Sequence, residues 1–309
     1  MTTRDKLAVA RGVATSTRPR GKGIGLRLSP YLFLLPSAVL LLAFFTAPLF
    51  SLLYYGFRET ALDGTSHFTG LDNYGILAQE TRFRANFTAT AQYLVGNLLI
   101  ATPIAYFAAV LISSKVRGSG ALRTLFLIPW VLSSVVTALL FKTMLDPNSG
   151  PVTQLLEFIV GRPLQLTLSQ EGSVLVIIVH AAWRSFPIQM LLIAAGMASI
   201  PQELYESVRV DGGNKWDEFR HITFPLTRVA LMAAILIITV FTLQDAEGVY
   251  ALTQGGPGYA TETAAVRLFK EAFVYFNIGL ASSIGLALIA VTVIILFLYS
   301  RVPGQKEAN

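Results

Sequence analysis

The sequence contains no cysteine and little charge. Only 14% of its 309 residues are Asp, Glu, Lys or Arg, while 53% are hydrophobic. Without cysteine the chain can form neither a disulfide nor a thiolate metal site. Its three histidines, at positions 67, 180 and 221, lack the spacing of metal ligands. Such an excess of apolar side chains cannot be buried in one soluble core, and it predicts a chain that lies in a lipid bilayer.

Motifs of catalysis and of nucleic-acid binding are absent as well. The sequence has no Gly-x-x-x-x-Gly-Lys-Ser/Thr phosphate loop, so we do not expect this chain to hydrolyse ATP. No nucleophile, base and orienting residue occur together in a recognisable order, and we expect neither an enzyme nor a bound cofactor. The net charge of +6 comes without the interleaved aromatic and basic residues of nucleic-acid binding proteins, so we expect no nucleic-acid partner.

What the sequence does contain is a series of six apolar runs. A helix needs about 20 mainly apolar residues to cross a bilayer. We extend the fourth run back to near Gly172, so that its helix includes His180 and Arg184, and we start the fifth near Pro225. The sequence therefore predicts an all-α membrane protein with six spanning helices in residues 29–303. The charge-free runs are 31–55, 86–112, 124–141, 185–202, 229–244 and 272–300.

The distribution of lysine and arginine predicts the orientation. Segments 1–28, 113–123, 201–228 and 301–309 hold 16 of these residues, whereas the loops on the opposite side hold 6. Lysine and arginine are in excess on the cytoplasmic side of membrane proteins. We therefore expect both ends, the basic tail 1–28 and residues 304–309, to be cytoplasmic. The first apolar run is too long for a cleaved signal peptide and is expected to stay as an anchor.

Three loops then face outward. Loop 56–84 is rich in turn residues and predicts a small cap, while loop 146–171 predicts irregular coil with one helical turn near 154–158. Loop 244–263 contains Gly255-Gly256-Pro257, which cannot continue a helix. Non-helical backbone at membrane depth is tolerated where it lines a cavity or is buried in protein. We expect this third loop to edge a translocation route, with a flexible linker as the alternative.

The cytoplasmic loop 200–225 predicts a short helix. Ser199 and Gln202 fit a capping box, and Pro201 is compatible with the first turn. The pair Gly212-Gly213 supplies the conformational freedom that ends the helix after about three turns.

One face of this helix is suited to a partner. Leu204 and Val208 are four residues apart and share an apolar ridge, while Glu203 and Glu206 lie near the positive end of the helix dipole. This pattern is typical of a helix that docks in a groove of another protein. An ordinary amphipathic loop between two spans is the alternative.

Three short motifs follow one another in the chain. They are Gly70-Leu-Asp-Asn-Tyr74, then Glu206-Ser-Val-Arg-Val-Asp-Gly212 with the exit Ile222-Thr-Phe-Pro225, and then Leu252-Thr-Gln-Gly-Gly-Pro257. Together they resemble the carbohydrate-type permease subunits of ABC importers, whose "EAA" loop reads Glu-Ala-Ala-x-x-x-Gly and exits through Ile-x-Leu-Pro. The resemblance covers residues 29–301. This chain departs from the family pattern at Ser207, Val208, Gly213 and Phe224.

The resemblance implies the type I permease fold of these importers and their assembly. In that family the Glu and Gly of the loop, here Glu206 and Gly212, belong to a helix that docks into a cleft on an ATP-binding subunit. The implied partners are a second homologous permease subunit, two copies of an ATP-binding subunit that carry ATP and Mg, an extracytoplasmic solute-binding protein and membrane lipid. The residues expected to couple to the ATPase are Glu203, Glu206, Arg209, Asp211, Gly212, Trp216 and Pro225.

Polar residues inside the apolar runs mark candidate positions of a solute route. An arginine at the centre of a spanning helix, such as Arg184, costs about 2.5 to 3.5 kcal/mol and needs compensation. It could donate to sugar hydroxyls or pair with a carboxylate such as Asp245 or Glu247. For Asn97 and Gln189, hydrogen bonds between helices are the first interpretation and lining of the route is the second. The candidate route residues are Asn97, Arg184, Gln189, Gly255, Gly256 and Pro257.

By this resemblance we expect a multi-pass subunit of the bacterial plasma membrane that passes a sugar or sugar-phosphate solute inward. The work of ATP would come from the separate ATP-binding subunits. The alternative is a secondary transporter driven by an ion gradient. That class typically shows matching broken helices and conspicuous intramembrane carboxylates, and the apolar runs here are nearly free of Asp and Glu.

Overall fold

The computed structural model describes residues 25–60, 65–113 and 118–301, with side chains from residue 33 onward. The chain separates into two compact units, residues 1–50 and 51–309. Helix α1 (Gly25–Gly56) begins in the first unit and ends in the second. Of the predicted basic tail 1–28, residues 1–24 lie outside the described part, as do the C-terminal residues 302–309.

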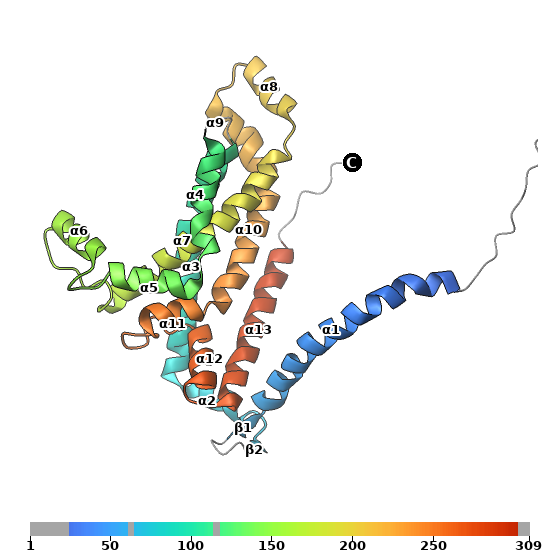
Figure 1. Cartoon of the computed structure of the whole chain (residues 1–309), viewed down its shortest axis with the longest axis vertical. Helices are drawn as coiled ribbons and strands as arrows, with labels where there is room; N and C mark the ends of the chain where they lie inside the picture. Colours follow the sequence, from blue (N-terminus) through green and yellow to red (C-terminus); the bar gives the residue numbers. More distant parts are fainter. Residues whose placement is uncertain (1–24, 61–64, 114–117, 302–309) are drawn as a thin grey trace, which may run out of the picture. The chain divides into compact units, whose positions relative to one another are not determined.

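The second unit is mainly helical (Figure 1). Its elements after α1 are β1 (Arg58–Thr60), β2 (Ser66–Phe68), α2 (Asp72–Gln79), α3 (Thr81–Ser113), α4 (Ser119–Val131), α5 (Ser134–Met144), α6 (Pro151–Val160), α7 (Gln170–Ala198), α8 (Gln202–Val210), α9 (Lys215–Glu218), the π-helix η1 (Phe219–Thr223), α10 (Phe224–Gln244), α11 (Glu247–Thr253), α12 (Ala264–Phe273) and α13 (Ile278–Ser300).

Five helical segments of the described chain are long and apolar enough to cross a membrane. They are Phe33–Gly56, Thr81–Ser113, Gln170–Ala198, Lys215–Gln244 and Ile278–Ser300. A sixth span is obtained when α4 and α5 are counted together. The predicted extension of the fourth run to near Gly172 and the predicted start of the fifth near Pro225 agree with α7 and α10.

The third predicted span consists of two helices. Helices α4 and α5 are bent by 93° at the break between them. Leu132 and Ser133 have extended backbone, with ψ of 145° and 140°, so the helical hydrogen-bond ladder stops there and restarts at Ser134. Neither residue at the break is glycine or proline, although Pro129 lies three residues before it inside α4.

The last predicted span also begins later than its apolar run. The run starts at residue 272, but α12 ends at Phe273 and α13 starts at Ile278. Phe276 has a positive φ of 56°, and the side chain of Asn277 accepts a hydrogen bond from the backbone N–H of Leu280. A helix cap therefore separates two helices where the composition suggested one.

Two of the loops predicted to face outward are more ordered than expected. In loop 56–84, β1 and β2 form a short antiparallel hairpin with Arg58 opposite Phe68, so the fold is not strictly all-α. In loop 146–171, α6 has ten residues instead of one turn, because Pro151 begins it and Gly161 ends it with a φ of 74°.

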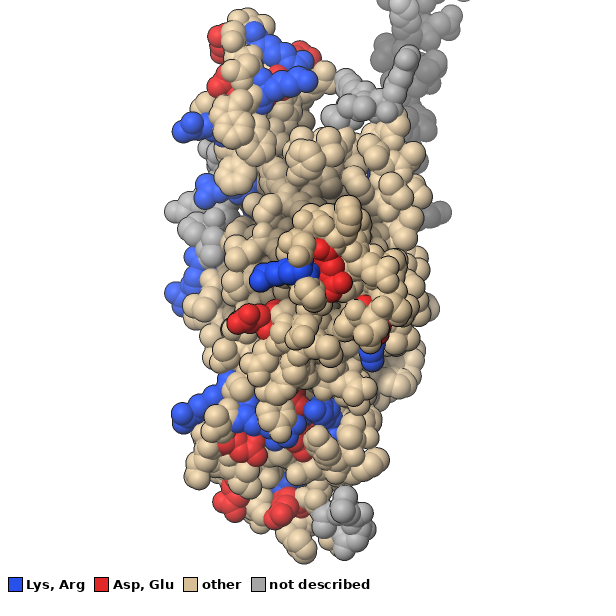
Figure 2. Space-filling model, turned by 90° about the vertical axis from the view of Figure 1, so that its left-hand side faces the viewer, with Lys and Arg blue, Asp and Glu red and all other residues tan. Residues whose placement is uncertain are grey.

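Helices α3, α7 and α10 form the core of the second unit. Small residues of α3, such as Ala101 and Ala105, are fully buried against Met190 and Ile193 of α7. Close approach through small residues is how helices pack where lipid replaces water. These three helices run between the end that carries α8 and α9 and the end that carries α2, β1, β2 and α12 (Figure 1). Figure 2 shows charged side chains near both ends of one face and a further group near its middle.

Candidate functional site

Helix α8 forms from loop 200–225 as predicted, but it starts differently. The predicted capping box is not formed, because Ser199 ends α7 and its hydroxyl donates to the carbonyl of Gly196 at 2.8 Å. Pro201 precedes α8 with extended backbone and no side-chain cap. Proline is well suited to this place, since its fixed φ needs no adjustment and it has no N–H to satisfy.

None of the nine residues of α8 is buried in the described chain. Glu203, Glu206 and Arg209 are exposed, and on the predicted apolar ridge Leu204 is 38% exposed while Val208 is half-buried. An isolated helix of nine residues is only marginally stable in water, and α8 buries no side chain that would stabilise it. Its conformation must therefore be supported from its ends.

The C-terminal end of α8 is tied to α9 by several contacts. After Asp211, Gly212 turns the chain with a φ of 83°, and the N–H of Gly213 donates to the Val208 carbonyl at 2.8 Å. Arg209 Nε donates to Glu218 Oε1 at 2.6 Å. The hydrogen bond and charge of Glu218 raise the pKa of Arg209. The turn between α8 and α9 is thus closed by backbone and side-chain bonds at once.

A second set of contacts joins α9 to the span that follows. Asn214 caps α9 and forms a capping box with Asp217. Sequence reasoning missed this cap, although the spacing Asn-x-x-Asp indicates it. Trp216 is 64% exposed and stacks on Phe219 at 5.4 Å between ring centroids. Pro225 lies in the first turn of α10. The helical run from Lys215 to Gln244 therefore connects the α8 turn to the bundle without interruption.

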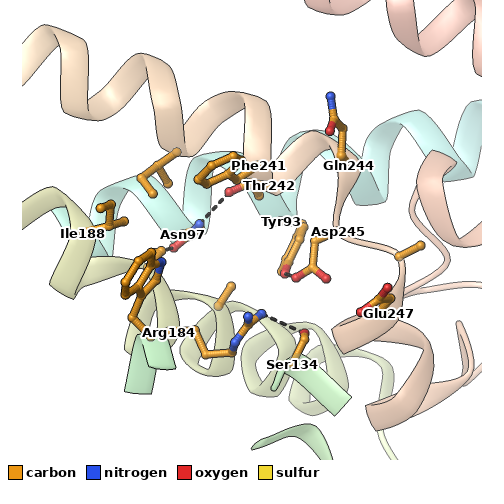
Figure 3. A pocket seen from close by; sticks show the side chains of 15 residues that line it. Tyr93, Asn97, Ser134, Arg184, Ile188, Phe241, Thr242, Gln244, Asp245 and Glu247 are labelled. Atoms are coloured by element: carbon orange, nitrogen blue, oxygen red, sulfur yellow. Dashed lines mark hydrogen bonds between the residues drawn. The ribbon is translucent and has the colours of Figure 1, made fainter. Parts of the chain in front are cut away.

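A polar pocket with a volume of about 370 Å³ lies along α3, α7 and α10 (Figure 3). This volume is in the range of roughly 300 to 1,000 Å³ that is typical of small-molecule sites. The side chains that give it polarity come from five helices and the segment between α10 and α11. They are Tyr93, Asn97, Ser134, Arg184, Ser185, Thr242, Gln244, Asp245 and Glu247, and Trp130 adds an aromatic wall.

Arg184 is the only lysine or arginine among the lining residues. Its Nη1 donates to the hydroxyl of Ser134 at 2.7 Å, while its buried Nε has no hydrogen-bond partner in the described chain. Asp245 and Glu247 line the same pocket, yet neither forms an ion pair with Arg184 within the described residues. Because a guanidinium has five N–H donors, Arg184 keeps others for the pocket that it lines.

Asn97 joins three helices and lines the pocket as well. Its Nδ2 donates to Thr242 Oγ1 of α10 at 2.8 Å, and its Oδ1 accepts from Ser185 of α7 at 2.9 Å. Asp245 accepts from the Tyr93 hydroxyl at 2.7 Å and from the N–H of Gly248 at 3.1 Å. These bonds fix the polar groups before any solute enters, which lowers the cost of binding.

The other predicted route residues lie elsewhere. Gln189 is buried and accepts from Thr102 of α3 at 2.9 Å, so it serves as an interhelical contact outside the pocket lining. Gly255, Gly256 and Pro257 do not line it either. Gly255 has a φ of 87°, and a Cβ added there would lie 3.0 Å from the Cβ of Glu262. The structure thus brings only Asn97 and Arg184 together in one pocket.

A buried ionic cluster holds the Gly-Gly-Pro loop, and sequence reasoning missed it. The Glu262 side chain is fully buried and accepts from Arg82 at 2.7 and 2.8 Å, from Lys270 at 2.8 Å and from Asn86 at 3.0 Å. Burial raises the pKa of Glu262, but these hydrogen bonds outweigh it and lower the pKa to about 2. The loop is therefore anchored to α3 and α12.

The described residues contain no group of three or more His, Asp or Glu side chains that could hold a metal ion. The site consists of two separate parts: a polar pocket among the spans and an exposed helix at one end of the bundle. Such an arrangement can bind a small polar molecule and contact another protein at a distance from it.

Comparison with known proteins bears directly on this arrangement. A family model described as the inner membrane component of binding-protein-dependent transport systems matches residues 101–303. A protein of Pyrococcus horikoshii described as "Probable ABC transporter permease protein" is 31% identical over 294 residues, which cover 90% of this chain and 98% of that protein.

Two further relatives have named transport systems. The sn-glycerol-3-phosphate transport system permease protein UgpA of Agrobacterium fabrum is 28% identical to this chain. The alignment covers 86% of this chain and 92% of UgpA. The trehalose/maltose transport system permease protein MalF of Thermococcus litoralis is 27% identical and is covered to 83%, with 81% of this chain aligned.

The fold has a counterpart among solved structures. One chain of a bacterial alginate ABC transporter, in complex with an alginate pentasaccharide-bound periplasmic protein, superposes with a TM-score of 0.78 at 22% identity. The match covers 89% of this chain and 94% of that one, which shows a shared fold. The resemblance inferred from the three motifs is confirmed, and since the family model spans more than half of the sequence, the chain belongs to the inner membrane components of binding-protein-dependent transport systems, the permease subunits of ABC importers.

Proposed function

We propose that this permease subunit carries a sugar-type solute through the pocket around Arg184 and Asn97, and that α8 connects this movement to an ATP-binding subunit. The pocket supports the first part, because it offers hydroxyl, amide, guanidinium and carboxylate groups beside Trp130, the mixture that suits a polyhydroxylated molecule. Two relatives named for trehalose/maltose and for glycerol-3-phosphate transport support the same class.

Helix α8 carries the second part of the proposal. No residue of it is buried, yet its C-terminal connection is fixed by the Arg209–Glu218 pair, the Gly212 turn and the helical run into α10. A rigid exposed helix of this kind transmits force to the span it is tied to when a partner moves it. We propose that the partner is an ATP-binding subunit, present in two copies that hold ATP and Mg, and that α8 docks into its surface through the helix-in-groove mode.

The complete assembly would then contain a second homologous permease subunit and an extracytoplasmic solute-binding protein. The binding protein is supported by the family description and by the alginate transporter, whose structure includes a periplasmic protein. In this arrangement six spans, with α4 and α5 forming the third, leave both chain ends and α8 in the cytoplasm. The loops at the hairpin and α12 end would face outward.

Copurification of the ATP-binding subunit from native membranes tests this proposal. The variant Glu206→Lys with Gly212→Pro reverses a charge on α8 and removes the left-handed turn, since proline cannot adopt the φ of 83° at position 212. We expect the ATP-binding subunit to be lost from the purified complex, by tenfold or more. Asp72→Lys is the matched control, because it reverses an exposed charge at the opposite end of the bundle.

A stable wild-type chain that brings no ATP-binding subunit would contradict the coupling role. Solute uptake that follows an imposed ion gradient without ATP would then favour a secondary transporter. Equal loss in the Asp72→Lys control would indicate damage to the fold instead of loss of a docking helix.

A further inference from the structure

The pocket around Arg184 has more acidic than basic side chains in its lining. Its lining contains one basic side chain, Arg184, and two acidic ones, Asp245 and Glu247, so its formal charge is negative. The pocket lies between spanning helices, where charges interact more strongly than in water. The sign of this charge therefore bears on which solutes can enter.

The two carboxylates differ in how they are held. Asp245 is fixed by two hydrogen bonds that its side chain accepts, from the Tyr93 hydroxyl and from the N–H of Gly248. Glu247 begins α11, is exposed, and has no hydrogen bond or ion pair within the described chain. One acidic group is thus a fixed part of the wall, while the other is available to accept a hydrogen bond.

Arg184 supplies the complementary donors. Its Nη1 is already bonded to Ser134, and its Nε is buried without a partner. A guanidinium carries five N–H donors, so Arg184 has others that a ligand oxygen in the pocket can use. In Figure 3 the Arg184 guanidinium and the Asp245 carboxylate face the same space from α7 and from the end of α10.

A hydroxyl group satisfies both sides of this space, because it accepts from Arg184 and donates to a carboxylate. A phosphate or carboxylate only accepts, and it would lie between Arg184 and two groups of its own sign. We propose that Asp245 and Glu247 make this pocket select uncharged polyhydroxylated solutes against phosphorylated or carboxylated ones. This inference rests on the proposed function of the pocket, and it further specifies that the solute is uncharged.

The relatives do not decide this point, since their names include both a trehalose/maltose system and a glycerol-3-phosphate system. Trehalose and trehalose 6-phosphate are the matched probes, because they differ only in the phosphate. Binding of each is measured by calorimetry on the purified complete transporter in nanodiscs, with no solute-binding protein present. The selectivity of the binding protein then does not enter the result.

We expect trehalose to bind at least tenfold more tightly than trehalose 6-phosphate. Glu247→Gln is expected to reduce this ratio severalfold, and Asp245→Asn with Glu247→Gln to reduce it at least tenfold. Glu171→Gln is the control, because it removes an exposed carboxylate that does not line this pocket and should leave the ratio unchanged.

Three results would overturn the inference. Equal or tighter binding of trehalose 6-phosphate by the wild type would reject the charge selectivity but leave a sugar pocket in place. An unchanged ratio in both pocket variants would reject Asp245 and Glu247 as its cause. Binding of neither probe by a transporter that still hydrolyses ATP would reject the sugar pocket itself, and with it this inference.

Discussion

The Glu262 side chain accepts four hydrogen bonds from other side chains. One fully buried carboxylate accepts hydrogen bonds from two cations and one amide, and the Arg82 guanidinium approaches it with two nitrogens. Breaking a buried ion pair by removing one partner costs about 3 to 5 kcal/mol. The side chains of Arg82 and Lys270 retain 23% and 15% exposure, so water offsets part of that cost.

We predict that Glu262→Gln lowers the free energy of unfolding by about 2 to 4 kcal/mol. The amide leaves Arg82 and Lys270 without a counter-charge, while the bond from Asn86 to the Glu262 backbone carbonyl still holds the loop to α3. Thermal unfolding followed by the fluorescence of the three tryptophans measures the change. Glu171→Gln, at an exposed carboxylate in the first turn of α7, should leave the transition within the error of the wild type.

The pH dependence of unfolding provides a second readout of the same group. The pKa of Glu262 is lowered from 4.5 to about 2, so its stabilisation is complete above pH 4.5 and is lost as the pH falls toward 2. A shift of this size corresponds to roughly 3 kcal/mol. A Glu262→Gln variant with the same loss of stability as the wild type across this window would contradict the assignment.

The ionic cluster illustrates the limit of sequence reasoning for single residues. Glu262 and Arg82 are 180 positions apart, and nothing local to either marks the other as its partner. Arg184, in contrast, could be singled out because an arginine inside an apolar run demands compensation wherever the run folds. Its actual neighbours, Ser134 and the Tyr93–Asp245 pair, required the packing of the helices to be known.

At the scale of elements, the α8 turn depends on the close approach of Gly213 to Val208. A Cβ at position 213 would lie 2.5 Å from the Val208 Cγ1 and 2.9 Å from the Val208 carbonyl oxygen. The hydrogen bond from the Gly213 N–H to the Val208 carbonyl must then lengthen or break. The turn is exposed, so its opening changes the position of α8 more than the stability of the bundle.

We predict that Gly213→Ala reduces solute-stimulated ATP hydrolysis by the assembled transporter about threefold to tenfold, with little change in the unfolding temperature. The reason is that α8 loses its fixed angle to α9 and α10. ATP hydrolysis by the purified complex in nanodiscs is the measurement. Gly120→Ala, where an added Cβ meets nothing within 4 Å, is the matched control, and an equal effect there would argue against the turn.

Elements were predictable where a local signal existed. The starts of α7 and α10 and the stop of α8 at Gly212 followed from apolar runs and from glycine. The position of the break at Leu132 and Ser133 did not follow in the same way, because α4 continues past Pro129 and two residues that are neither glycine nor proline adopt extended backbone. The pocket depends on that break, since Trp130 and Ser134 reach it from its two sides. Its composition could therefore not be assembled from sequence alone.

At the scale of the whole molecule, the absence of cysteine makes the predicted orientation directly testable. Single cysteines at Asn148 and at Ser207 would each stand at an exposed position, the first beyond α5 and the second on α8. If α8 is cytoplasmic, a membrane-impermeant maleimide added to spheroplasts should label the cysteine of Asn148→Cys and spare that of Ser207→Cys. The cysteine-free wild type supplies the background.

Opening the membranes should make both cysteines reactive, which controls for access at Ser207. Labelling of Ser207→Cys in sealed spheroplasts, with Asn148→Cys spared, would reverse the proposed topology. The result would bear on the docking of α8 too, because an ATP-binding subunit is available on the cytoplasmic side only.

The bend between α4 and α5 has a consequence for biogenesis. Each helix alone, with 13 and 11 residues, is shorter than the roughly 20 needed to cross the hydrocarbon core. Helix α5 packs on α11, which leaves the ribosome about a hundred residues later. The contacts between α5 and α11 can form only after α11 has been synthesised, so part of the packing that holds the bend is completed late in translation.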